Sequence, residues 1–77
     1  MNTMQTSTIN IIYYPTRRGY SGYSKELDGL NTNGKTIEEL YQKIRYLIDI
    51  RVKTLLELGR EKEANQLKES ELIFSED

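Results

Sequence analysis

The chain has 77 residues, of which 36% are hydrophobic and 30% charged, with a formal net charge of −1 and neither cysteine nor histidine. This length allows one small domain with a thin core, and the balanced charge gives no overall attraction to nucleic acid or to an anionic membrane. The missing residue types exclude disulfides, thiolate nucleophiles, histidine bases and Cys/His metal sites, so no catalytic, metal-binding or cofactor-binding residue is expected.

The N-terminal residues 1–7 are polar, and we expect them to be flexible. They lack the basic and apolar regions of a secretion signal, and no later stretch approaches the roughly 18 apolar residues of a membrane span. These features predict a cytoplasmic chain in which residues 1–77 form a single domain.

A first strand is expected at residues 8–14, which read TINIIYY and end at the only proline, Pro15. The stretch is rich in β-branched and aromatic residues, as strands are. In an extended chain Ile12 and Tyr14 fall on one face and the other apolar residues on the opposite face. One face can therefore meet a helix while the other meets a partner.

A Pro- and Gly-containing turn joins this strand to a second strand at residues 20–25 and carries two arginines at its tip. Arginines at an exposed turn serve most often as solubilising charges, but their guanidinium forks also match phosphate or an acidic partner. We predict a partner-binding surface made of these arginines and the tyrosines beside them: Arg17, Arg18, Tyr20 and Tyr23.

Tyrosines cluster on the first two strands next to the arginines, and stacking of unpaired bases on strand aromatics is one way of binding RNA. Core packing and protein contact are commoner uses of tyrosine in small sheets. The balanced charge also argues against RNA, so the expected partner is a protein and not a nucleic acid.

Residues 19–40 read GYSGYSKELDGLNTNGKTIEEL and mark the change from strand to helix. A tight turn is expected at Gly29, where glycine permits positive φ, and a short edge strand follows at residues 30–32. Thr36 and Glu39 have the spacing of a capping box, in which each side chain accepts a hydrogen bond from the other residue's backbone N–H. A helix is therefore predicted from Ile37.

Apolar residues recur at helical spacing from Ile37 to about Leu58, and Gly59 is a typical helix stop. Tyr46 and Ile50 lie four residues apart, away from the main apolar stripe. An apolar pair of this kind favours contact with another molecule, although isolated apolar residues on a surface are common.

Residues 60–77 are expected to form a second, short helix with few apolar anchors and an acidic tail. The apolar run at 72–74 either packs back as a strand or plug, or reaches a neighbouring subunit. Because the core is thin and apolar residues occur on both faces of the first strand, we predict a homodimer. The residues expected to mediate self-association are Ile12, Tyr14, Tyr46 and Ile50.

The stretch from residue 19 to 40 resembles the signature of HicB-type antitoxin domains, which is approximately G-Y-x-A-x-x-P-D-L-P-G-C-x-T-x-G-x-T-x-E-E-A. The matching positions are Gly19, Tyr20, Leu27, Gly29, Thr32, Gly34, Thr36, Glu38 and Glu39. The departures include Lys25 and Asp28 in place of two prolines, Glu26 in place of Asp, Leu30 in place of Cys and Leu40 in place of Ala.

The resemblance implies an α+β fold in which a three-stranded antiparallel sheet carries one long helix on a face. This arrangement is similar to part of the double-stranded-RNA-binding fold and often has an extra strand after the helix. Such domains bind and block a small ribonuclease, the HicA-type toxin. Full-length members usually add a C-terminal DNA-binding domain, for which the residues after Gly59 are expected to leave no room.

We therefore expect a non-enzymatic protein that inhibits a partner, with a HicA-type ribonuclease as the first candidate. The alternative is a phage or mobile-element inhibitor of host defence, similar to an anti-CRISPR protein, which masks a nuclease or sequesters a nucleotide between subunits. An enzyme would have to rely on carboxylate, tyrosine or lysine chemistry.

Overall fold

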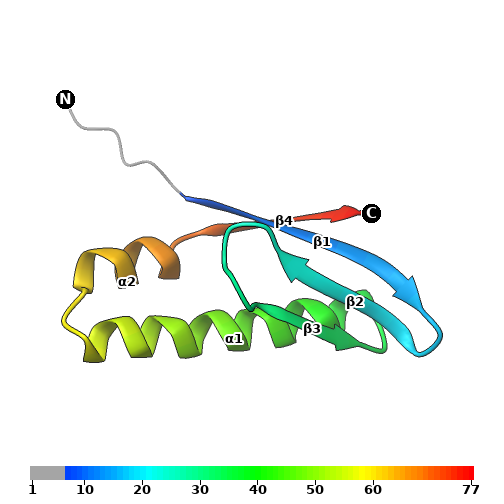
Figure 1. Cartoon of the computed structure of the whole chain (residues 1–77), viewed down its shortest axis with the longest axis horizontal. Helices are drawn as coiled ribbons and strands as arrows, with labels where there is room; N and C mark the ends of the chain where they lie inside the picture. The colour runs from blue at the N-terminus through cyan, green and yellow to red at the C-terminus, as the bar shows by residue number, and fades with distance from the viewer. Residues whose placement is uncertain (1–6) are drawn as a thin grey trace.

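The computed structural model describes residues 7–77, in which a four-stranded sheet packs against two helices (Figure 1). The strands are β1 (Thr8–Thr16), β2 (Gly19–Ser24), β3 (Asn31–Gly34) and β4 (Glu71–Glu76), and the helices are α1 (Ile37–Glu57) and α2 (Glu61–Lys68). The α+β class predicted from the sequence is confirmed. Within these residues, no helix is long and apolar enough to cross a membrane.

The sheet is mixed, because β4 pairs parallel with β1 while β1, β2 and β3 pair antiparallel in the order β3-β2-β1-β4. The predicted three-stranded antiparallel sheet was therefore one strand too small. Leu72 and Phe74 of β4 lie beside Ile9 and Ile11 of β1 on the same face. Their packing on the core explains why the C-terminal stretch forms a strand instead of a plug.

The core lies between the helices and the face of β1 that carries Ile9 and Ile11, which are 3% and 0% exposed. The apolar stripe of α1 covers this face, and α2 closes one end of it with Ala64. Full burial of an aliphatic side chain contributes about 1.5–3 kcal/mol, so these few contacts supply much of the stability of so small a domain. The buried residues of α1 are Leu40, Ile44, Ile48 and Val52.

The boundaries of β1, β2 and β3 differ from the prediction by one or two residues, and β1 continues through Pro15 to Thr16 instead of ending before the proline. Lys25 is outside β2, because the Ser24 hydroxyl accepts hydrogen bonds from the backbone N–H groups of Glu26 and Leu27 at 3.1 and 2.9 Å and turns the chain. Leu30 precedes β3 and is buried in the core. The tight turn between them contains Gly29 at φ +78°, as expected.

Gly34 ends β3 where the sheet meets the start of α1. A Cβ atom at this position would lie 2.6 Å from the backbone nitrogen of Leu40, which is closer than real side chains approach. Glycine at this position therefore allows the strand and the first turn of α1 to pack against each other directly.

The two ends of α1 have the predicted signals, with one correction. The Thr36 hydroxyl accepts from the Glu39 backbone N–H at 3.0 Å, but the Glu39 carboxylate accepts from the N–H of Lys35 at 2.7 Å, so the second half of the predicted capping box was wrong. The carboxylate reaches one residue further back and still satisfies a backbone donor. At the other end, Gly59 has φ +79° and closes a Schellman motif.

The cap gives a test of this helix start. We expect Thr36→Ala to lower the free energy of unfolding by about 1 kcal/mol, because one N-terminal N–H loses its acceptor. Thr54→Ala is the matched control, since Thr54 lies inside α1 with its hydroxyl bonded to the carbonyl of Ile50, and alanine favours a helix interior. Equal urea midpoints for the wild type and Thr36→Ala would contradict the role of the cap.

Candidate functional site

The face of the sheet turned away from the helices carries a group of exposed apolar side chains. Tyr14 and Tyr23 are each 40% exposed and Ile73 is 42% exposed, and no described element covers them. The strand pairing places Tyr23 opposite Ile12 on this face, and Ile73 beside Asn10. We refer to Ile12, Tyr14, Tyr23 and Ile73 as the open face.

The open face combines residues that the sequence assigned to two different roles. Ile12 and Tyr14 were predicted to mediate self-association, and Tyr23 to bind a partner. The cross-strand pairing of Ile12 with Tyr23 makes them neighbours on one surface. A partner and a second copy of the chain would therefore compete for the same residues.

Tyr20 lies on the opposite side of the sheet from Tyr23, apart from the predicted partner surface. Its ring meets that of Tyr13 edge to face at a centroid distance of 6.1 Å, and both rings pack against the core. Positions 20 and 23 differ by an odd number of residues along one strand, so their side chains point to opposite faces. This alternation was available in the sequence and separates Tyr20 from the other three predicted contacts.

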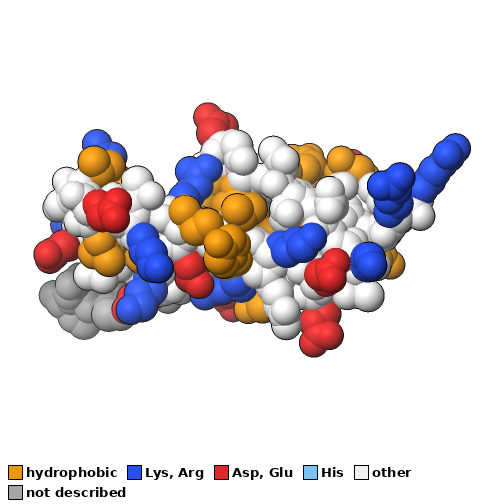
Figure 2. Space-filling model, turned by 90° about the horizontal axis from the view of Figure 1, so that it is seen from below, with side chains coloured by type: hydrophobic (Ala, Val, Ile, Leu, Met, Phe, Trp, Pro, Cys, Tyr) orange, Lys and Arg blue, Asp and Glu red, His pale blue; other side chains and the backbone are white. Residues whose placement is uncertain are grey.

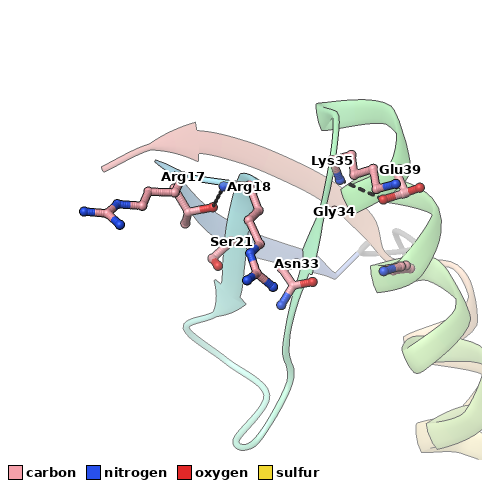
Figure 3. Close-up of a pocket in the computed structure, with 9 residues that line it drawn as sticks. Arg17, Arg18, Ser21, Asn33, Gly34, Lys35 and Glu39 are labelled. Atoms are coloured by element: carbon pink, nitrogen blue, oxygen red, sulfur yellow. Dashed lines mark hydrogen bonds between the residues drawn. The ribbon is translucent and has the colours of Figure 1, made fainter.

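Arg17 and Arg18 occupy the turn between β1 and β2, where both are exposed. The backbone N–H of Arg18 donates to the Thr16 hydroxyl at 3.3 Å, which shapes the turn. Figure 3 shows the two side chains diverging, with Arg17 pointing outward and Arg18 pointing toward Ser21 and Asn33. The two arginines therefore face different surroundings.

A second apolar surface lies on the far side of α1. Tyr46 is 65% exposed and Ile50 is 43% exposed, and both line a groove of about 400 Å³ between α1 and α2. Figure 2 shows hydrophobic side chains gathered on this side of the molecule with basic and acidic side chains around them. Tyr46 and Ile50 are thus placed apart from the open face, on the other layer of the fold.

Glu26 closes one end of the open face. Its carboxylate accepts hydrogen bonds from the backbone N–H of Asn10 at 2.8 Å and from the Asn10 side-chain amide at 2.7 Å. These bonds to the charged form, the side-chain bond above all, hold the pKa of Glu26 below its ordinary value. The side chain thereby continues the pairing of β1 beyond the end of β2.

The open face and the β1–β2 turn are the surfaces on which the fold gathers candidate contact residues. Residues 7–77 contain no group of three or more His, Cys, Asp or Glu side chains arranged to hold a metal ion. The features that the fold brings together are aromatic and aliphatic side chains on the open face and positive charge at the β1–β2 turn. Such groups suit recognition of another molecule.

Comparison with known proteins gives no match to any family model, curated protein or solved structure. The function of the chain is therefore inferred from its own sequence and surfaces.

The Glu26 contact predicts a pH-dependent contribution to stability. Because the folded pKa is lowered, the contribution is present above the unfolded pKa of about 4.3 and is lost as the pH falls through the folded value. We expect Glu26→Gln to be less stable than the wild type at neutral pH and to lose less stability on acidification. Urea unfolding at a series of pH values measures this difference.

Asn10→Ala is the companion variant, since it removes the side-chain donor and leaves the carboxyl group in place. It should reduce the same acid-dependent loss in part, because the backbone N–H of residue 10 still donates. A wild-type acid profile in both variants would show that the contact contributes nothing to the stability of the fold.

Proposed function

We propose that the chain is a non-enzymatic cytoplasmic inhibitor that binds a protein partner through the open face and the β1–β2 turn. The first candidate partner is a ribonuclease of the HicA type. The supporting observation is the arrangement of the elements, in which three antiparallel strands and a long helix are followed by β4, a strand that returns to the sheet. The resemblance to HicB-type antitoxins implies such an extra strand. We therefore also propose that the chain is a HicB-like domain, similar to part of the double-stranded-RNA-binding fold.

The composition of the open face supports a protein partner. Tyrosine and arginine are enriched at the centres of protein interfaces, where a rigid ring or a guanidinium fork gives much contact for little lost conformational freedom. Tyr14 and Tyr23 supply the rings, and Arg17 supplies a fork that points into solvent beside them. Binding through this surface would block access of RNA if it covers the part of the ribonuclease that receives RNA.

The acidic residues near β4 suit the same kind of partner. A ribonuclease receives a polyanion, so the surface that an inhibitor must block is basic. Glu71 and Glu76 at the ends of β4 are exposed, and Asp77 follows them beside Tyr13, where its backbone N–H donates to the Tyr13 carbonyl at 2.8 Å. Glu71 lies on the same face of β4 as Ile73, so this acid and the arginines at the turn give the open face two charged borders that can fix the orientation of a partner.

An inhibition assay tests the proposal. We expect the chain to abolish cleavage of a fluorescent RNA by a HicA-type ribonuclease at equimolar ratio, starting with any such enzyme encoded beside its gene. Reversing the charge of both arginines, Arg17→Glu with Arg18→Glu, should weaken the binding measured by calorimetry at least tenfold, by the loss of charge-assisted contacts.

Lys62→Glu with Lys68→Glu is the matched control, because it changes the net charge equally on exposed positions of α2, away from the turn. Equal loss of affinity in both double variants would indicate long-range attraction and remove the arginines from the interface. If no ribonuclease of this type is inhibited, the proposed partner is wrong, and a nuclease of host defence becomes the next partner to assay.

Self-association of the free chain is the companion prediction. A monomer leaves the open face in water, whereas a two-fold dimer buries it against its own copy. We expect sedimentation equilibrium at micromolar concentration to give twice the 9.0 kDa chain mass, and Tyr14→Lys to restore the monomer. Tyr46→Lys, at a tyrosine on α1 that is 65% exposed against 40% for Tyr14, should leave the dimer intact.

The reverse result, a dimer that Tyr46→Lys dissociates and Tyr14→Lys does not, would move the interface to α1. A wild-type mass near that of one chain would contradict self-association altogether.

A further inference from the structure

A cavity of about 440 Å³ lies where the β1–β2 turn, the end of β3 and the start of α1 meet (Figure 3). Four basic residues contribute to its walls, namely Arg17, Arg18, Lys35 and Lys43, against the single acid Glu39. They come from three separate parts of the chain, and only the fold brings them together. The cavity is within the size range of small-molecule sites.

The side chains at the cavity are arranged for an anion. Arg18 points toward Ser21 and Asn33, which are cross-strand partners on β2 and β3, so a guanidinium, a hydroxyl and an amide lie near one another. Arg17 points away into solvent. The positive side chains available to a ligand in the cavity are therefore those of Arg18, Lys35 and Lys43.

In the part of the chain that the structure describes, the basic side chains at the cavity form no ion pair. Within residues 7–77, the ion pair present is that of Arg60 with Glu63 on α2, far along the chain from this site. The carboxylate of Glu39 accepts from the backbone N–H of Lys35 and is in this way held by the start of α1. A chain whose net charge is only −1 thus gathers three cations around one hollow.

The residues that line the cavity also indicate which part of a ligand it recognises. None of the described residues at the cavity is aromatic, and most are basic or polar. A nucleobase is usually held by stacking on aromatic rings or an arginine plane, whereas phosphate is held by charge and by N–H and O–H donors. Arg18, Lys35, Lys43, Ser21 and Asn33 supply the second set of groups.

We propose that this cavity is a binding site for a phosphate-bearing ligand, held through Arg18, Lys35 and Lys43 and recognised by its phosphates rather than by a base. The site goes beyond inhibition of a protein partner and does not depend on it. Lys43 of α1 lines the cavity and has no part in the surface proposed for the partner, so Lys43→Ala separates the two activities.

The test is a titration of the full chain, labelled with ¹⁵N, with sodium tripolyphosphate, ATP and GTP, followed by amide chemical shifts. We expect shifts concentrated at Arg18, Ser21, Asn33 and Lys35. The affinities for the three ligands should agree within about threefold, since each carries three linked phosphates and the site recognises phosphate rather than a base. Affinity should also fall as salt is added. Citrate, a trianion without phosphate, is the control ligand and should bind more weakly.

Substitutions then test which residues bind the phosphates. We expect Arg18→Ala and Lys43→Ala each to lower the affinity for tripolyphosphate about tenfold, the size of a hydrogen bond to a charged group. Lys53→Ala, on an exposed position of the same helix as Lys43, is the matched control and should bind as the wild type does. Circular dichroism confirms that each variant is folded.

Each outcome of these titrations either supports the phosphate site or overturns it. A short single-stranded RNA whose binding is lost in Arg18→Ala and Lys43→Ala would support the site and identify a nucleic-acid backbone as the source of the phosphate. The absence of shifts at millimolar tripolyphosphate would overturn it. Equal binding of citrate or of a polyglutamate peptide, or equal loss of affinity in Lys53→Ala, would overturn it as well, because charge alone would then explain the attraction.

Discussion

The packing of the α1 stripe onto Ile9 and Ile11 is the contact on which the rest of the structure depends. It decides which face of β1 is buried, and because side chains alternate along a strand, it also decides that Ile12 and Tyr14 face away from the helices. Gly34 brings the end of β3 against the first turn of α1. Burial of one face and exposure of the other thus follow from the same few apolar contacts. A domain this small does not provide further helices to cover the exposed face.

Local signals in the sequence predicted the helices and turns well. They could not predict which strands pair with each other over long distances in the chain. The cap at Thr36, the stop at Gly59 and the turn at Gly29 act within a few residues of themselves, so each could be recognised from its neighbours. The place of β4 depends on Leu72 and Phe74 finding the far edge of β1, and nothing near residues 71–76 specifies that neighbour or its parallel direction. The apolar run alone was compatible with a strand, a plug or an intersubunit contact.

The candidate surfaces show the same division. The exposed apolar residues of β1 and the arginines of the turn follow from strand alternation and turn chemistry, which are local. Ile73 joins the open face only through the parallel pairing of β4, and Lys43 reaches the cavity only because α1 returns past the turn. Tyr20 is the case in which a local rule was enough, since its odd spacing from Tyr23 already places the two rings on opposite faces.

The parallel direction of β4 also determines where anything joined to the chain would lie. Since β4 runs the same way as β1, Glu71 is next to Ser7, to which its N–H donates at 2.9 Å, whereas Asp77 lies beside Tyr13 near the arginine-bearing turn. The two ends of the described chain therefore emerge at opposite ends of the sheet (Figure 1). A tag, dye or fused domain after residue 77 would therefore sit beside the β1–β2 turn, at the end of the sheet opposite Ser7.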